Sequence, residues 1–320
     1  MGGVAAFNCL TNFNFTHNSF SLNLAEVALE KKPTTDSRGG FRVDLDFGAA
    51  TDWVHGLEPG GVEAYKHIQQ AYVSYLAPTA KGTVQFDFGK FVTWNGNEVI
   101  ETKDNWNYSR SLLFALAIPY YHTGIRAAYS PTDKVTVTGV LVNGWNNVVD
   151  DNTGKTVGVS LTGKPTGSFT IVANYTGGPE ATGNNADWRH LFDATASYTA
   201  SKAASVAINY DIGTDKSSNQ TWQGVALYLK YQANDWFAVV PRYEFLKDKD
   251  GFMTGASQNM QEFTLTTEFK HKDGVLMRIE YRGDFSNSSA GYFITDTTGL
   301  KKNQNVLTVG WIYAFSSKTP

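Results

Sequence analysis

Few residues of this chain have the types and spacing that catalysis would require. The run from Gly158 to Lys164 resembles a phosphate-binding loop, but proline follows the lysine where Ser or Thr is needed, and a strand rather than a helix is expected next. Ser160 lacks the second glycine of a nucleophile elbow. Ser109 with His122 is the only Ser/His pair that we would test for hydrolysis. The sequence therefore favours a protein that is not an enzyme.

Metal and heme chemistry find no better support. The 6 histidines are spread along the chain without a compact ligand spacing. Cys9 is the single cysteine, so the chain has neither an internal disulfide nor a heme-attachment pair. We expect no cofactor and no metal.

Composition narrows the class of protein further. With 42% apolar, 14% aromatic and 18% charged residues, the chain is too apolar for disorder and carries fewer charges than an average soluble domain. A net charge of -3 gives no basic surface for nucleic acid, so we expect none as a partner. No apolar run reaches the roughly 18 residues that a membrane-spanning helix needs.

Strict alternation of apolar and polar residues is the main structural signal, and it is clearest between residues 223 and 315. One phase is apolar: Val225, Leu227, Leu229, Tyr231, Phe237, Val239, Pro241, Tyr243, Phe245, Phe263, Leu265, Thr267, Phe269, Val275, Met277, Ile279, Tyr281, Leu307, Val309, Trp311, Tyr313 and Phe315. The other phase is polar: Arg242, Glu244, Glu262, Thr264, Thr266, Glu268, Arg278, Glu280 and Arg282. One face of each strand therefore suits hydrocarbon and the other suits water.

The connectors alternate as well, because short turns take turns with long polar loops. This pattern is typical of an all-β fold in which an antiparallel up-and-down sheet closes into a transmembrane β-barrel, with short periplasmic turns and long extracellular loops. We predict about 16 strands (range 14–18) in a single domain over residues 1–320. The predicted strands cover about residues 3–10, 19–31, 39–48, 68–77, 83–91, 119–130, 135–143, 155–163, 168–176, 190–199, 204–211, 223–231, 236–246, 261–270, 275–284 and 304–315.

Aromatic residues gather near the two ends of the predicted strands. Amphipathic rings at these heights are expected at the two membrane interfaces. The residues predicted to contact the interfaces are Tyr129, Phe169, Tyr175, Tyr198, Tyr210, Tyr231, Phe237, Tyr243, Phe269, Tyr281, Tyr313 and Phe315. Ordinary enrichment of Tyr and Phe in strands is the alternative explanation.

Several segments carry a family resemblance. They are residues 23–26 (NLAE), 84–91 (VQFDFGKF), 96–101 (GNEVIE), 107–111 (NYSRS), 119–126 (PYYHTGIR) and 310–315 (GWIYAF). Together they resemble the OmpL-like β-barrel porin family of Gram-negative bacteria. The resemblance implies an outer-membrane, pore-forming protein whose solutes are unassigned for most members of the family.

Residues 92–118 form the longest predicted connector. By analogy of fold with general porins, we expect it to fold into the lumen, since its apolar run at 112–118 would be costly in water. A solvated loop that caps the barrel is the alternative. The residues predicted to line the pore or its constriction are Asp87, Glu98, Glu101, Asp104, Arg110, Arg126, Asp193, Arg242, Glu244, Glu262, Glu268, Arg278, Glu280 and Arg282. Pairing of these charges across strands, to steady the wall, is an equally open role.

Passive diffusion of small hydrophilic solutes and ions is the function that these features favour, with weak selectivity and a slight preference for cations. The expected location is the bacterial outer membrane, in contact with its lipid, as a possible homo-oligomer. Residues 1–3 (MGG) open no signal sequence, so we expect a mature or trimmed form. A barrel that houses a partner such as a multiheme cytochrome, an outer-membrane barrel enzyme and a soluble carbohydrate-binding β-sandwich are the alternatives.

Overall fold

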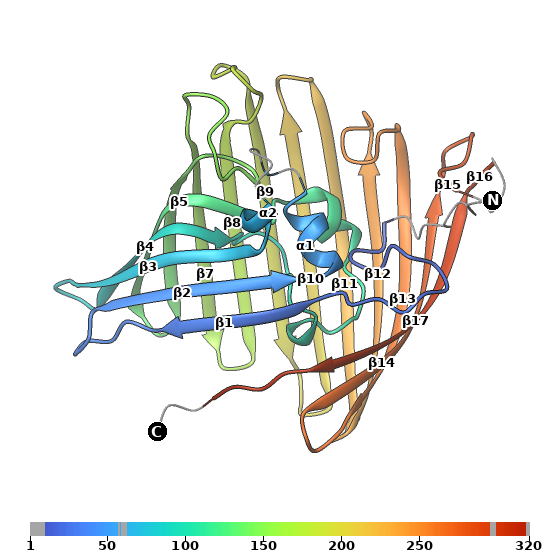
Figure 1. The fold of residues 1–320 in the computed structure, drawn as a ribbon, viewed down its shortest axis with the longest axis horizontal. Helices are drawn as coiled ribbons and strands as arrows, with labels where there is room; N and C mark the ends of the chain where they lie inside the picture. The colour runs from blue at the N-terminus through green and yellow to red at the C-terminus, as the bar shows by residue number, and fades with distance from the viewer. Residues whose placement is uncertain (1–9, 57, 59–62, 295–298, 318–320) are drawn as a thin grey trace.

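The computed structural model describes residues 10–56, 58, 63–294 and 299–317. In this part of the chain, 15 strands form one antiparallel sheet in which each strand pairs with the next along the sequence (Figure 1). The strands are β1 (Ala25–Lys31), β2 (Gly39–Phe47), β3 (Ile68–Pro78), β4 (Thr83–Val92), β5 (Tyr121–Thr132), β6 (Val135–Val142), β7 (Thr156–Thr166), β8 (Phe169–Pro179), β9 (Trp188–Thr199), β10 (Ala204–Asp215), β11 (Gln220–Asn234), β12 (Phe237–Asp248), β13 (Gln258–Lys270), β14 (Val275–Ser286) and β17 (Asn303–Tyr313).

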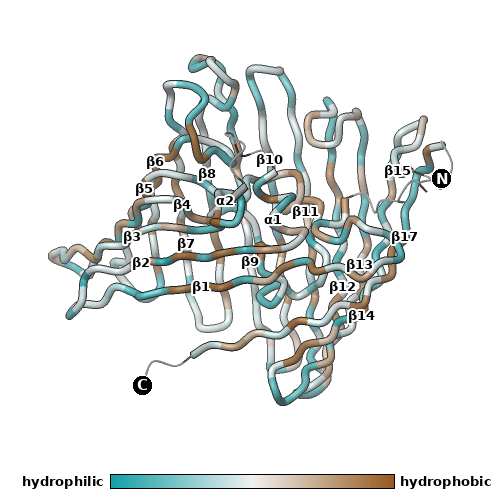
Figure 2. Tube along the Cα trace, in the orientation of Figure 1, coloured by the Kyte–Doolittle hydropathy of each residue, from teal (hydrophilic) through white to brown (hydrophobic). Residues whose placement is uncertain are grey.

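The predicted alternation of faces is present along the strands. In β11, Leu227 and Leu229 are 46% and 42% exposed, whereas Ala226 and Tyr228 between them are 0% and 4% exposed. Figure 2 shows apolar residues along the strands, for example in β1 and β2, with polar residues in the turns and loops. Such an apolar outer face would be costly in water. It fits the lipid-facing surface of a transmembrane β-barrel, which is the predicted fold class.

Short turns and long loops also alternate as expected. Two residues separate β5 from β6 and β7 from β8, whereas 13 residues separate β6 from β7. The remaining helices and strands lie in the long connectors: α1 (Ala49–Val54), α2 (Glu63–Lys66), a 3-10 turn (Thr102–Asp104), a π-helical turn (Leu113–Ala117), β15 (Phe293–Ile294) and β16 (Leu300–Lys301). Among the described residues, no helix is long and apolar enough to cross a membrane.

The N-terminal part differs from the prediction in two ways. The predicted strand at 3–10 lies almost entirely outside the described residues, and Leu10 is in a turn. The predicted strand at 19–31 begins only at Ala25. The reason is a competing set of hydrogen bonds, because the carbonyls of Leu22 and Asn23 accept from the amides of Ala49 and Ala50. The backbone of residues 22–23 therefore holds the start of α1 instead of continuing β1.

The two ends of the 15-stranded ladder are β1 and β17. Within the described residues, residues 10–24 lie against the inner side of this region. The side-chain amide of Asn14 donates to Thr308 Oγ1 in β17 (2.8 Å), and that of Asn23 donates to the Tyr108 hydroxyl (2.7 Å). The N-terminal segment thus contacts both β17 and the long connector that follows β4.

Candidate functional site: the inward segment and the wall that holds it

Residues 93–120, which join β4 to β5, form what we call the inward segment. Figure 1 shows this stretch and α1 within the concave side of the curved sheet. Leu112, Leu113 and Ala117 are fully buried and belong to one apolar cluster with Ala226 and Leu246 of the sheet. The apolar run that the sequence placed in a loop is therefore covered by packing against the polar-phase side of the wall.

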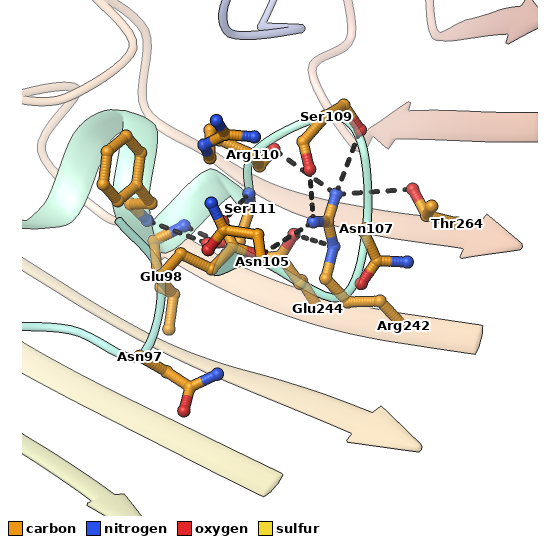
Figure 3. Close-up of polar contacts among 12 residues, drawn as sticks. Asn97, Glu98, Asn105, Asn107, Ser109, Arg110, Ser111, Arg242, Glu244 and Thr264 are labelled. Carbon is orange, nitrogen blue, oxygen red and sulfur yellow. Dashed lines mark hydrogen bonds and ion pairs between the residues drawn. The ribbon is translucent and has the colours of Figure 1, made fainter. Parts of the chain in front are cut away.

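Three arginines of β12 and β14 bind the backbone of the inward segment. Arg242 donates to the Ser109 carbonyl (2.8 Å) and Arg282 to the Arg110 carbonyl (2.6 Å), as Figure 3 shows in part. Arg278 donates to the carbonyls of residues 102, 105 and 107 at 2.7–3.0 Å. A guanidinium carries five donors in a fixed plane, so one side chain can fix several carbonyls at once.

Carboxylates of the same wall bind the amides of the segment. Glu280 accepts from the amides of Tyr108 (2.6 Å) and Ser109 (2.9 Å). Glu244 accepts from the amides of Leu112 (3.0 Å) and Leu113 (3.2 Å), where the π-helical turn begins. The wall therefore supplies both donors and acceptors, so that amides and carbonyls of an irregular segment are satisfied without water.

Arg242 is the centre of this charged network. Besides the Ser109 carbonyl, it contacts Glu98 of the segment (2.9 Å), Glu262 of β13 (2.9 Å) and Glu244 of its own strand (3.2 Å). All of these side chains are at most 6% exposed. A guanidinium between three buried carboxylates compensates charge that would otherwise be unpaired.

Arg110 fastens the segment to itself. Its guanidinium donates to the carbonyls of Val99 (2.8 Å), Ile100 (2.6 Å) and Tyr108 (2.7 Å), which closes the segment into a compact loop. It also lies 5.3 Å from the ring centre of Phe13. Burial lowers the pKa of Arg110 to about 10, a value at which the side chain is still charged near neutral pH.

Tyr108 rests directly on a glycine of β17. A Cβ added at Gly310 would lie 2.1 Å from Tyr108 Cε2. We expect Gly310→Val to push this ring off the wall and to lower the free energy of unfolding by about 1–3 kcal/mol, as overpacking does. Denaturant unfolding in detergent measures the change. Gly139→Val is the matched control, because no atom lies within 4 Å of its added Cβ. An equal loss in both variants would contradict the close contact.

The residues predicted to line the pore fall into two groups. Most are buried: Asp87, Glu98, Arg110, Asp193, Arg242, Glu244, Glu262, Glu268, Arg278, Glu280 and Arg282. Arg126 pairs with Asp87 at 2.8 Å, Glu268 pairs with Arg278 at 2.7 Å, and Asp193 accepts from the amides of Asn174 and Asn209. Glu101, Asp104 and Arg126 keep exposed surface. The buried group holds the wall and the inward segment together, which is the structural role left open for these charges.

A second connector also packs inside, which the sequence did not indicate. Residues 48–56 and 58 follow β2, and His55 Nδ1 lies 2.9 Å from Glu58 Oε1, whose carboxylate also accepts from the Lys90 ammonium. Burial lowers the pKa of His55. Burial alone would raise the pKa of Glu58, but hydrogen bonds from His55 and Lys90 lower it. The only sequence signal was a short run with apolar residues at positions 49, 50, 53 and 54.

Ser109 and His122 do not form the pair that hydrolysis would need. Ser109 Oγ lies 3.4 Å from Nη2 of Arg242 and 3.4 Å from Nη1 of Arg282. His122 contacts the Gly144 carbonyl through Nδ1 (2.9 Å) and Thr93 Oγ1 through Nε2 (3.2 Å). Each side chain is committed to other partners.

The predicted interface aromatics lie on the other face of the sheet. Tyr129, Phe169, Phe237 and Phe269 are partly exposed. The others are at least 36% exposed: Tyr175, Tyr198, Tyr210, Tyr231, Tyr243, Tyr281, Tyr313 and Phe315. Their contact with a membrane interface stays a prediction.

Comparisons with known proteins bear on the fold and the family. The chain is similar to the anion-selective porin from Comamonas acidovorans (11% identity, TM-score 0.62, covering 94% of this chain and 92% of that one). It is also similar to OmpF of Salmonella typhi, solved with daunomycin (13%, 0.61, 95% and 94%). A third similar structure is the trimer form of OmpT of Vibrio cholerae (14%, 0.57, 90% and 91%). At these identities the likeness shows the fold alone.

A search of curated proteins finds no match to this chain. The family described as "Putative beta-barrel porin-2, OmpL-like" matches residues 4–315, which is nearly the whole sequence and agrees with the resemblance read from its segments. The fold and this match together show that the chain belongs to the OmpL-like β-barrel porin family and is a porin of the Gram-negative outer membrane.

Proposed function

We propose that this porin is a channel for passive diffusion of small hydrophilic solutes and ions, and that the inward segment narrows it. The observation that carries the proposal is the docking of residues 93–120 on the polar face of β12–β14 by buried arginines and carboxylates. A loop fixed in this way occupies cross-section of the lumen permanently. The barrel strands and the inward segment then act as one domain.

The proposed constriction is lined by the charges that remain exposed. On the inward segment these are Glu101, Lys103 and Asp104, of which the last two form a surface ion pair. The buried arginines of β12 and β14 are matched by carboxylates and backbone carbonyls, so they do not present a free positive surface. This arrangement supports weak selectivity with a slight preference for cations.

Two alternative roles for the barrel can be weighed against the same contacts. A sleeve for a partner protein needs free internal space, but the chain's own residues 93–120 and 48–56 pack on the concave side. Homo-oligomer formation stays a prediction, and the trimer form of the Vibrio cholerae protein of similar fold supports it.

Planar-bilayer recording of the detergent-folded protein under a potassium chloride gradient tests the channel. We expect discrete conductance steps, because a barrel of about 15 or 16 strands leaves room for water. We also expect a small reversal potential with the sign of cation preference. Absence of steps from protein whose folding is demonstrated by its heat-dependent gel mobility would contradict the proposal.

A further inference from the structure

A group of acidic and amide side chains lies between the first three strands and the inward segment, away from the arginine network. Glu26 of β1 is directly opposite Asp46 of β2 in the ladder. Gln69 of β3 donates to Glu101 of the inward segment (2.6 Å), and the carboxyl groups of Glu101 and Glu26 are within hydrogen-bonding distance of each other. These four residues define what we call the acidic subsite.

Three oxygens of the acidic subsite have no partner. Asp46 Oδ1, Glu26 Oε2 and Gln69 Oε1 are buried atoms without a hydrogen bond. Asp46 and Gln69 are only 1% and 0% exposed. A buried acceptor without a donor costs about 1–3 kcal/mol, and more when it is charged. The subsite therefore has an unmet need for donors.

No positive side chain of the described residues forms an ion pair with Glu26, Asp46 or Glu101. The two nearest lysines are committed elsewhere: Lys90 binds Glu58, and Lys103 binds Asp104. In the arginine network, by contrast, Glu262 and Glu268 each have a guanidinium within 2.9 Å. Like charges directly opposite in a ladder are destabilising. The subsite thus lacks the positive charge that the rest of the wall has.

Solvent has access to one side of the subsite. Glu26 and Glu101 are partly exposed, and Lys103 and Asp104, just beyond Glu101, are exposed. A solute moving past the inward segment would therefore meet the partly exposed carboxylates first and the buried oxygens of Asp46 and Gln69 behind them.

We propose that the acidic subsite binds the ammonium group of a cationic organic solute, a specificity that rests on the proposed channel function. A primary ammonium carries three N–H donors, which matches the three oxygens without partners. Its charge also compensates the carboxylates that have no basic neighbour. Within the described residues, no three His, Cys, Asp or Glu side chains are arranged to hold a metal ion, which favours an organic cation.

Calorimetry with 1,4-diaminobutane tests the proposal on the detergent-folded protein. Asp46→Asn and Glu26→Gln are each expected to weaken binding about tenfold or more, because a charge-assisted hydrogen bond is lost. Both variants relieve repulsion between neighbouring carboxylates, so they are expected to fold. Asp104→Asn is the matched control, since it removes an exposed carboxylate of the same segment that already pairs with Lys103. Its affinity is expected to stay within about twofold of the unmodified protein.

The bis-trimethylammonium analogue of the same diamine separates donors from charge. It has the same charge but no N–H group, and we expect it to bind about tenfold or more weakly. Equal affinity of the two amines, equal affinity of all three variants, or no binding of the diamine to the unmodified protein would each overturn the subsite. Calorimetry needs no open pore. Protein that conducts without binding overturns the subsite alone, and protein that binds without conducting overturns the channel alone.

Discussion

Replacing Arg242 with methionine is expected to destabilise the protein strongly and to release the inward segment. The substitution leaves Glu98, Glu244 and Glu262 buried together without their shared guanidinium, and it removes the donor to the Ser109 carbonyl. Breaking a buried charge pair by removing one partner costs about 3–5 kcal/mol. We expect a loss of this size in denaturant unfolding, together with faster amide hydrogen exchange in residues 93–120.

Two further variants isolate the effect of Arg242. Arg126→Met removes another arginine of the polar face, but Arg126 pairs only with Asp87 and has no contact with residues 97–118. We expect it to leave exchange in the inward segment unchanged. Adding Glu262→Gln to Arg242→Met removes one of the stranded carboxylates and is expected to recover part of the lost stability. Protection of residues 93–120 that is unchanged in Arg242→Met would refute the anchoring role of this side chain.

Deleting residues 94–106 is expected to produce the largest change in conductance. This stretch contains the exposed charges of the proposed constriction, whereas residues 107–118, which hold most of the contacts to β12–β14, remain. A wider lumen should raise single-channel conductance and reduce the reversal potential under a potassium chloride gradient. Planar-bilayer recording measures both.

The matched control shortens a different connector. Residues 181–186 lie between β8 and β9 in a loop whose contacts are with residues 151 and 153 of the neighbouring loop. Removing them should leave single-channel conductance close to that of the unmodified protein. If deletion of 94–106 changed conductance no more than this control does, the inward segment would not be the constriction.

Much of the fold could be predicted from the sequence, because strand faces depend on a local period of two. Leu227 and Tyr228 are adjacent in sequence, yet one is 46% exposed and the other 4%. The turn residues between β5 and β6 and between β7 and β8 were likewise readable from local chemistry. The N-terminal strand was read wrongly, since the bonds that divert residues 22–23 come from Ala49 and Ala50, about two dozen residues later.

The candidate site was predictable only in part, for the same reason of distance along the chain. The sequence placed Arg242, Arg278 and Glu280 on a polar face and residues 92–118 in an inward-folding connector. It could not show which of them meet, because Arg242 and Ser109 are 133 positions apart. Alternation alone also cannot distinguish a charge that faces water from one that holds a segment.

The sequence by itself determined the strand periodicity, the polar and apolar faces, the family and hence the porin fold. Only the tertiary structure decided which polar-phase charges are buried, that residues 48–56 also pack inside, and that Glu26, Asp46, Gln69 and Glu101 meet. The physical reason is that the period of a strand is a property of neighbouring residues. The pairing of buried charges depends on the surfaces that the curved sheet brings together from distant parts of the chain.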